Sequence, residues 1–258
     1  MPASNHFGPG IDAERYSRAR PHIHDAAIGK FRAFAGAGAP FSRALDVGCG
    51  TGQSTVALTA IADVVIGVDP SADMLAHAVS HPRVSYRRAP AEDIPFPDGQ
   101  YDVITAAQAF HWFDAEAFLA EASRLLRSPG WLVIYTSWFT GEMVEEATFA
   151  PWFRQTFLVQ YPTPARNRTA ITNTLAQAHS LTLRADDTFS NDLEMSSEAF
   201  IDYELSTTNV IAAVERGHSS FGEAAVWMRE SLGLFFGDHP QRTFRFAGSI
   251  WYLKKQTA

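Results

Sequence analysis

The feature that most limits how this chain can fold is a glycine-rich turn that directly follows a short apolar strand. Residues 44–52 read Ala-Leu-Asp-Val-Gly-Cys-Gly-Thr-Gly, and a segment of helical composition continues to residue 61. A strand, a turn with alternating glycines and a helix form the opening unit of an open α/β sheet. Because glycine has no Cβ, the turn exposes backbone against which a small charged ligand can lie. We therefore expect a ligand site at the end of this strand.

The alternation of strands and helices continues through the first half of the chain. Apolar runs and turn residues predict strands at 44–47, 64–68, 84–88, 101–106 and 131–136, and helices at 53–61, 72–79 and 114–126. This alternation predicts an α/β fold with a parallel sheet covered on both faces.

After residue 138 the alternation stops, and aromatic and proline residues become frequent. Sheet-like sequence returns at 188–193, helical stretches follow at 197–206 and 222–236, and 244–253 alternates like a strand. We interpret the middle of the chain as an insertion that caps the sheet. The predicted organisation is N-terminal lid helices (1–39), a ligand-binding core (40–138), a mainly helical cap insertion containing the 188–193 strand (139–240) and a final core strand (241–258).

Composition excludes several classes of protein. The 258 residues are 46% hydrophobic and 19% charged, with a net charge of −7, which suits a globular chain and disfavours nucleic acid or an anionic membrane as partner. No segment resembles a membrane span or a signal peptide, so we expect a cytoplasmic protein. The single cysteine, Cys49, cannot form an internal disulfide. His22 and His24 have no accompanying ligand cluster, so no metal site is expected.

Four predicted strand ends carry residues suited to one ligand crevice: the glycine turn, Asp69, residues 91–93 and residues 108–113. A carboxylate at Asp69 can accept both hydroxyls of a ribose, and residues 91–93 can contact an adenine edge. An acid precedes the glycines, and their spacing is G-x-G-x-G. A dinucleotide motif, G-x-G-x-x-G, would need glycine where Gln53 stands. Both details indicate S-adenosylmethionine as the cofactor.

The motifs allow a resemblance to be named. Residues 45–52, 68–71, 91–99 and 101–104 resemble the core pattern of class I S-adenosylmethionine-dependent methyltransferases of the small-molecule, ubiquinone-biosynthesis type. Tyr16-x-x-x-Arg20-Pro21 and His111-Trp112-Phe113-Asp114 are similar to the trans-aconitate methyltransferase-like branch. The resemblance implies a Rossmann-like, doubly wound sheet of seven strands, mostly parallel with the last strand antiparallel. It fades over about 139–240, where we expect acceptor identity to reside.

The resemblance also implies roles for individual residues. The methionine end of the cofactor would contact Asp46 and the backbone of Gly48, Cys49, Gly50 and Gly52. The ribose would contact Asp69. The adenine face would contact Pro70 and Met74, and the adenine edge would contact Ala91 and Glu92. Gln108 and Arg20 complete the expected cofactor-binding set. Many relatives carry an acid where this chain has Pro90, so Glu92 is the substitute candidate. The product would be S-adenosylhomocysteine.

Two residues are candidates for a role in catalysis. His111 follows the fourth predicted strand and could act as a general base or orient the acceptor, because histidine accepts a proton near neutral pH. It could equally pack against the next helix. Tyr16 could face the transferred methyl group from an N-terminal lid, or Tyr16 and Arg20 could simply hold that lid in place.

The acceptor is expected to be a small molecule, and the enzyme a monomer or homodimer. Aromatic residues of the cap favour an aromatic or amphipathic metabolite of natural-product biosynthesis if they wall a pocket, although most could be cap core. The alternative acceptor is a small carboxylic acid, which would need converging arginines; the cap offers Arg154, Arg166, Arg168 and Arg184. A nicotinamide oxidoreductase and a non-catalytic cofactor-binding module are the competing functions. Residues 107–111 also lack the Asn/Asp-Pro-Pro-Tyr pattern of nucleic-acid amino-methylating enzymes.

Overall fold

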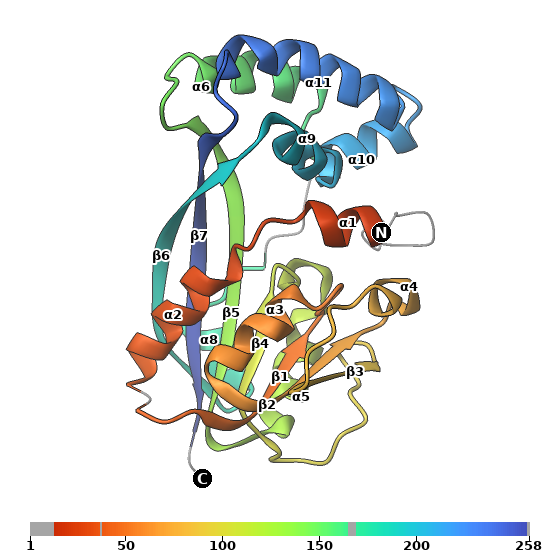
Figure 1. Cartoon of the computed structure of the whole chain (residues 1–258). Coiled ribbons are helices and arrows are strands. Elements are labelled where there is room, and N and C mark those ends of the chain that lie inside the picture. The colour runs from red at the N-terminus through yellow and green to blue at the C-terminus, as the bar shows by residue number, and fades with distance from the viewer. Residues whose placement is uncertain (1–12, 37, 165–168, 257–258) are drawn as a thin grey trace.

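A seven-stranded sheet runs through the whole molecule in the order β3-β2-β1-β4-β5-β7-β6 (Figure 1). The computed structural model describes residues 13–36, 38–164 and 169–256. The strands are β1 (Phe41–Val47), β2 (Ala62–Asp69), β3 (Val84–Arg88), β4 (Tyr101–Ala107), β5 (Leu126–Met143), β6 (Leu181–Met195) and β7 (Arg242–Lys255). Strand β7 is antiparallel to both of its neighbours, so the other six strands share one direction. This confirms the predicted Rossmann-like α/β fold.

The strand order reverses between β1 and β4. The chain builds β2 and β3 on one side of β1 and then returns to place β4 on the other, where Asp46 pairs with Thr105. Open α/β sheets bind ligands at the carboxyl ends of the strands beside such a reversal. The topology therefore places a crevice beside the glycine turn.

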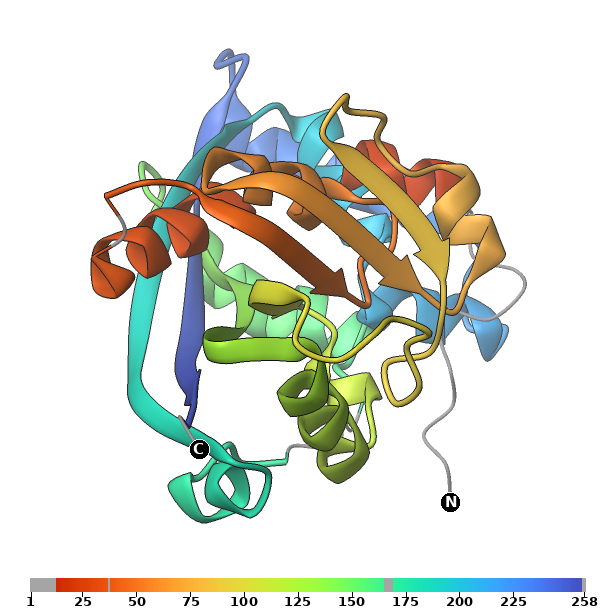
Figure 2. The same ribbon diagram turned by 90° about the horizontal axis from the view of Figure 1, so that it is seen from below.

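Helices cover both faces of the sheet. On one face, α2 (His24–Ala35) buries Ala27, Ile28 and Phe31 against β2, β4, β5 and β7, near the short elements α3 (Gln53–Ala57) and η1 (Leu58–Ala60). On the other, α5 (Ala115–Leu125) and α8 (Asn173–Ala178) pack against alternate residues of the same strands (Figure 2). Two short elements, α4 (Ala72–Ala76) and η2 (Phe110–Trp112), follow β2 and β4. Helix α2 falls within the range predicted as lid, yet it packs as part of the core.

Of the range predicted as lid, α1 (Ala13–Ala19) lies between the core and the cap (Figure 1). The Gln53 side chain donates to the carbonyls of Ser17 and Arg20 at 2.8 and 3.3 Å, which joins the helix after the glycine turn to the end of α1. Residues 1–12, which were also expected in the lid, lie outside the described part of the chain.

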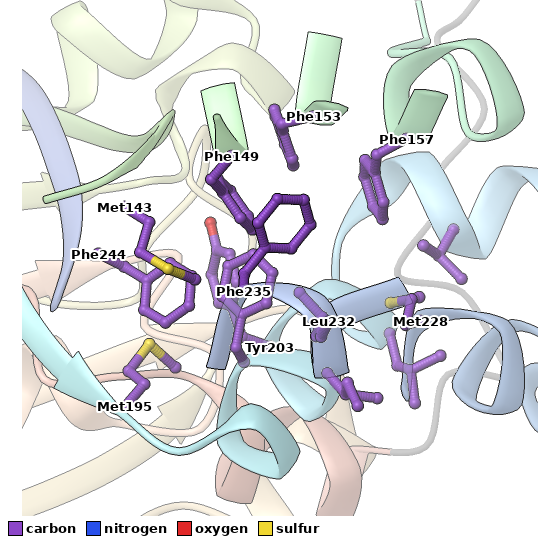
Figure 3. Close-up of a cluster of buried hydrophobic side chains, with 14 of the residues drawn as sticks. Met143, Phe149, Phe153, Phe157, Met195, Tyr203, Met228, Leu232, Phe235 and Phe244 are labelled. Atoms are coloured by element: carbon purple, nitrogen blue, oxygen red, sulfur yellow. The ribbon is translucent and has the colours of Figure 1, made fainter. Parts of the chain in front are cut away.

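The cap consists of two segments. The first contains α6 (Phe149–Trp152), the π-helical turn η3 (Phe153–Phe157) and α7 (Leu158–Gln160); the second contains α9 (Ser197–Leu205), α10 (Thr208–Glu215) and α11 (Phe221–Phe236). Their aromatic and methionine side chains point toward one another and toward the upper ends of β5 and β7 (Figure 3). Phe200 and Phe244, for example, stack with ring centroids 4.1 Å apart.

Strands β5 and β6 are longer than predicted, and α10 was not predicted. Strand β5 extends to Met143 because β7 pairs with it from Trp131↔Lys254 to Met143↔Phe244, and β6 pairs with β7 over Leu181–Met195. Gly130 and Gly141 interrupt the apolar alternation of β5, and for this reason the sequence predicted a shorter strand. No helix in the described ranges is both long and apolar enough to cross a membrane.

Candidate functional site

A cavity of about 450 Å³ lies where the topology places a crevice. Its walls come from the glycine turn, from residues that follow β2 and β4, and from the segment that joins α1 to α2. Of the residues predicted as a site, those lining the cavity are Tyr16, Arg20, Gly48, Cys49, Gly50, Asp69, Pro70, Met74 and Gln108. Those that do not line it are Asp46, Gly52, Ala91, Glu92 and His111.

The three glycines of the turn adopt backbone conformations that other residues rarely take. Gly48, Gly50 and Gly52 have φ values of +70°, +52° and +80°. A Cβ on Gly48 would lie 2.6 Å from the Ala109 Cβ, and one on Gly52 would lie 2.1 Å from the Tyr86 hydroxyl. Both positions therefore require glycine for packing as well as for φ. Gly50 faces the cavity and Met74.

Asp69 ends β2 with its carboxylate held at the cavity wall. One oxygen accepts the Gly50 N–H at 2.9 Å, and the other accepts the Ser71 N–H at 2.8 Å. Each oxygen keeps acceptor capacity for a further donor. Burial raises the pKa of this carboxyl, and the two backbone hydrogen bonds oppose that shift. The arrangement suits a ligand that offers two adjacent hydroxyl groups.

Asp46 lies beneath the cavity rather than in its wall. Its carboxylate is fully buried and accepts the hydroxyls of Ser54, Thr55 and Thr105 at 2.6, 2.8 and 2.7 Å. Burial raises its pKa, while these three hydrogen bonds lower it. The side chain therefore joins β1, β4 and α3, and its expected contact with a cofactor stays a prediction.

Gln108 has a φ of +58° and lines the cavity where β4 ends. Its side-chain amide donates to the Ser137 carbonyl and accepts the Ser137 N–H, both at 2.8 Å. Its own N–H donates to the Tyr135 carbonyl at 2.9 Å. Both ends of the amide are therefore engaged by β5, and the residue fixes the left-handed turn at the cavity.

The residues of the loop after β3 are not among those that line the cavity. Glu92 accepts the Asp114 N–H at 2.9 Å, at the start of α5, and Ala91 is buried. Arg124 holds the rest of the loop by donating to the carbonyls of Ile94 and Phe96 at 3.0 and 2.8 Å. The predicted adenine-edge residues are therefore outside the cavity wall.

The two candidate catalytic residues are placed differently. Tyr16 lines the cavity, and the guanidinium of Arg20 lies 4.6 Å from the centre of its ring. His111 does not line it; its ring is 4.7 Å from the ring of Trp112, which does. Trp112 and Phe113 are the aromatic wall at the end of β4.

Arg20 connects the cavity to the cap. It donates to the Ser206 carbonyl at 2.9 Å, and its guanidinium lies 5.5 Å from the ring centre of Tyr203. Its Nε is buried and has no hydrogen-bond partner among the described residues. A buried donor without a partner is costly, so this atom is suited to an anionic ligand group.

His24 is a cavity residue that the sequence did not indicate. Its Nδ1 lies 2.9 Å from the hydroxyl of Tyr135 on β5, and the side chain is buried. Burial, followed by the nearby charges of His22 and Arg20, lowers its pKa to about 4. The partner lies 111 residues away in the chain. No local pattern could have revealed this contact.

The aromatic side chains of the cap, for which the sequence left open a place in the cap core or in a pocket wall, do not line the cavity. Phe149, Trp152 and Phe157 pack in the cap cluster. Arg154 and Arg184 are exposed elsewhere, and Arg166 and Arg168 fall outside the described residues. The described ranges contain no cluster of three or more histidine, cysteine or acidic residues that could hold a metal ion.

Comparison with known proteins places this site in a family context. Residues 45–134 match the family described as Methyltransferase domain. A Dictyostelium discoideum protein named as a methyltransferase is 44% identical over 93 residues, which cover 36% of this chain and 35% of the relative. A Saccharomyces cerevisiae protein named as an S-adenosylmethionine-dependent methyltransferase is 26% identical over 147 residues, or 54% of this chain and 49% of the relative.

Among solved structures, a protein of Anaeromyxobacter dehalogenans titled as a type II methyltransferase superposes with a TM-score of 0.65 at 25% identity. The superposition covers 92% of this chain and 96% of the other. The matches to the two curated relatives, in contrast, span between about a third and a half of those proteins' length.

Proposed function

We propose that this chain, whose residues 45–134 match a methyltransferase domain, is a class I S-adenosylmethionine-dependent methyltransferase that methylates a small molecule. The cavity volume of about 450 Å³ falls in the range of single-ligand sites. The observation that carries the proposal is Asp69. Its two oxygens, each fixed by one backbone N–H, are presented at the cavity wall beside the glycine turn.

The remaining cavity groups fit the cofactor. Asp69 would hold the ribose hydroxyls, the backbone near Gly50 the methionine end, and Pro70 and Met74 the adenine face. The buried Nε of Arg20 is suited to the methionine carboxylate. When bound, S-adenosylmethionine supplies a methyl group on a sulfonium, which is open to in-line displacement. The protein contributes alignment and exclusion of water, which is where most of its acceleration would arise.

The acceptor would lie against the segment between α1 and α2 and the end of β4. The cavity there carries the rings of Tyr16, Trp112 and Phe113 together with Ile23. An aromatic or amphipathic metabolite, such as those of natural-product biosynthesis, matches these walls. Tyr16 is the proposed orienting group or proton acceptor, and His111 would act through its contact with Trp112.

O-methylation of a small carboxylic acid is the alternative. It would need a cationic group in the acceptor region, and Arg20 and Arg88 are the cavity arginines among the described residues. Arg88 is exposed and donates to the Pro70 carbonyl at 2.9 Å. If Arg20 holds the carboxylate of the cofactor, it is not available for the acceptor. This distribution of charge favours the aromatic class.

The proposal is tested by binding and by turnover. Asp69→Asn should weaken S-adenosylhomocysteine binding in calorimetry by tenfold or more, because charge-assisted hydrogen bonds to a carboxylate are lost. The matched control is Asp63→Asn, near the opposite end of β2, where the side chain is exposed. Equal binding by both variants would contradict the assignment of the ribose site.

Turnover should be followed with S-adenosylmethionine labelled in its methyl group and a panel split between aromatic metabolites and carboxylic acids. Label in a stable aromatic product supports the proposed acceptor class. Label in an alkali-labile ester supports the alternative. Preferential binding of NAD(H) by the wild-type protein would overturn the cofactor itself.

A further inference from the structure

The contact between His24 and Tyr135 is a buried polar pair that the proposed cofactor site does not use. His24 begins α2 and lines the cavity, whereas Tyr135 is 1% exposed on β5 and does not line it. The Nδ1 of His24 lies 2.9 Å from the Tyr135 hydroxyl. The imidazole ring of His24 therefore lies between the buried Tyr135 of β5 and the cavity.

The protonation of the pair follows from the partners available. A hydroxyl has one hydrogen to donate, and the Tyr135 hydroxyl has the His24 ring as its hydrogen-bond partner among the described residues. If His24 donated from Nδ1, the buried hydroxyl hydrogen would have no acceptor there, and a buried donor without a partner is unfavourable. Tyr135 is therefore the donor, Nδ1 is the acceptor, and the ring hydrogen of neutral His24 is on Nε2.

The surroundings keep both members of the pair neutral. Burial lowers the pKa of His24 to about 4, with further lowering from His22 and Arg20. Burial raises the pKa of Tyr135 well above its usual range, and Asp46 and Asp25 add to this shift. At neutral pH the ring is thus an uncharged donor at Nε2 and not a proton acceptor.

We propose that His24 positions the methyl acceptor by donating a hydrogen bond from Nε2 to an oxygen of that molecule. This inference rests on the proposed function and makes the acceptor class more specific: an aromatic or amphipathic molecule with a carbonyl or hydroxyl oxygen beside the atom that is methylated. The oxygen that binds His24 is not the reacting atom, because donation to a nucleophile would lower its reactivity. Nδ1 is already bonded to the Tyr135 hydroxyl, so Nε2 is the ring nitrogen of this cavity residue that remains to donate to a bound molecule.

The state of the ring is tested directly by NMR of protein with ¹⁵N-labelled histidine and S-adenosylhomocysteine added. His24 should show a hydrogen on Nε2 at pH 7 and keep this form at pH 5, because burial lowers its pKa to about 4. Tyr135→Phe should allow both neutral forms. A hydrogen on Nδ1, or protonation of His24 near pH 6, would overturn the inference.

The role toward the acceptor is tested with a substrate from the labelled panel. His24→Phe removes the donor but keeps a ring, and should raise KM for the acceptor or lower kcat/KM by tenfold or more. His24→Gln offers an amide N–H in place of Nε2 and should restore part of the loss. The matched control is His22→Phe, because His22 is exposed; this variant should have the wild-type kcat/KM for the acceptor.

Three further readouts separate positioning from other roles. Affinity for S-adenosylhomocysteine should stay within about twofold in His24→Phe, and so should the shape of the pH–rate profile. Loss of the acidic limb of that profile would make His24 a general base, contrary to the inference. An unchanged kcat/KM in His24→Phe would also overturn it, whereas a wild-type protein that binds no S-adenosylhomocysteine would overturn the proposed function and this inference together.

Discussion

At the scale of single residues, the glycine turn shows how one side chain can be excluded for two independent reasons. Gly48 combines a φ of +70° with a Cβ position 2.6 Å from the Ala109 Cβ and 2.9 Å from Phe113. The first reason is a property of the backbone, and the second is a property of packing against η2. Glycine is required by the fold at this position before any ligand is considered.

Gly48→Ala should lower the free energy of unfolding by about 2 kcal/mol or more. The left-handed backbone alone costs about 1–2 kcal/mol for a residue with a Cβ, and the overlap with Ala109 adds to it. The matched control is Gly29→Ala in α2, where a Cβ would meet nothing within 4 Å. That change should raise stability by about 0.5–1 kcal/mol. Urea unfolding measures both, and similar values for the two variants would contradict the argument.

The sequence indicated which residues end each strand but not which way their side chains point. Asp46 and Asp69 both follow apolar strands, yet Asp69 reaches the cavity and Asp46 meets three hydroxyls beneath it. Both side chains lie on the same face of the sheet, because Asp46 pairs with Gly67 and Asp69 follows two residues later on β2. Asp69 reaches the cavity because it lies further toward the carboxyl ends of the strands. His24 was missed because its partner comes from a distant strand.

At the scale of elements, the loop between β3 and β4 is held by two side chains of α5, Arg124 and Glu121. The Arg124 guanidinium donates to both carboxylate oxygens of Glu121 and to the carbonyls of Ile94 and Phe96. Glu121 in turn accepts the Ile94 N–H at 2.7 Å. The loop has no strand or helix of its own, so these bonds fix its path.

Arg124→Ala should destabilise the protein by about 2–3 kcal/mol and speed amide hydrogen exchange at residues 89–100, because buried carbonyls and Glu121 lose a charged donor. The control is Arg127→Ala, in which an arginine with 43% side-chain exposure loses a surface ion pair to Asp102. That change should cost less than about 1 kcal/mol. If hydrogen exchange in the loop responded equally to both changes, Arg124 would not be its anchor.

Sequence patterns were most informative for β1 to β4 and least informative for β5 and β6. Strands β1 to β4 are short and bounded by turns, and β3 has the predicted bounds of 84–88. Strand β5 continues through Gly130 and Gly141, whose presence in a run normally marks its end. Its full length is set by pairing with β7, which comes a hundred residues later in the chain.

At the scale of the whole molecule, two buried titratable groups set opposite pH limits on stability. Burial lowers the pKa of His24 to about 4, so the unfolded state binds more protons between about pH 4 and 6.5 and stability rises with pH there. Burial raises the pKa of Glu204 to about 8, against the opposing effect of Arg20. The folded state then binds more protons between about pH 4.5 and 8, and this group makes stability fall as pH rises.

Glu204→Gln should therefore be more stable than the wild type at pH 8.5 and close to it at pH 4, because the amide stays neutral in a site where the carboxylate is disfavoured. The control on the same helix is Glu198→Gln, in which an exposed carboxylate loses its bonds to Arg229. Urea unfolding at several pH values measures the difference. A constant gap between Glu204→Gln and the wild type across this range would rule out titration of Glu204.

The continuity of β5 has a mechanical consequence. The same strand pairs with β4 in the core, holds the Gln108 amide through Ser137, and enters the aromatic cap beyond a register shift between Phe139 and Glu142. The cap is therefore joined to the core through hydrogen-bonded strands and not through a flexible linker. A movement of the cap that twists β5 would therefore also move Ser137 and, through it, the Gln108 amide at the cavity wall.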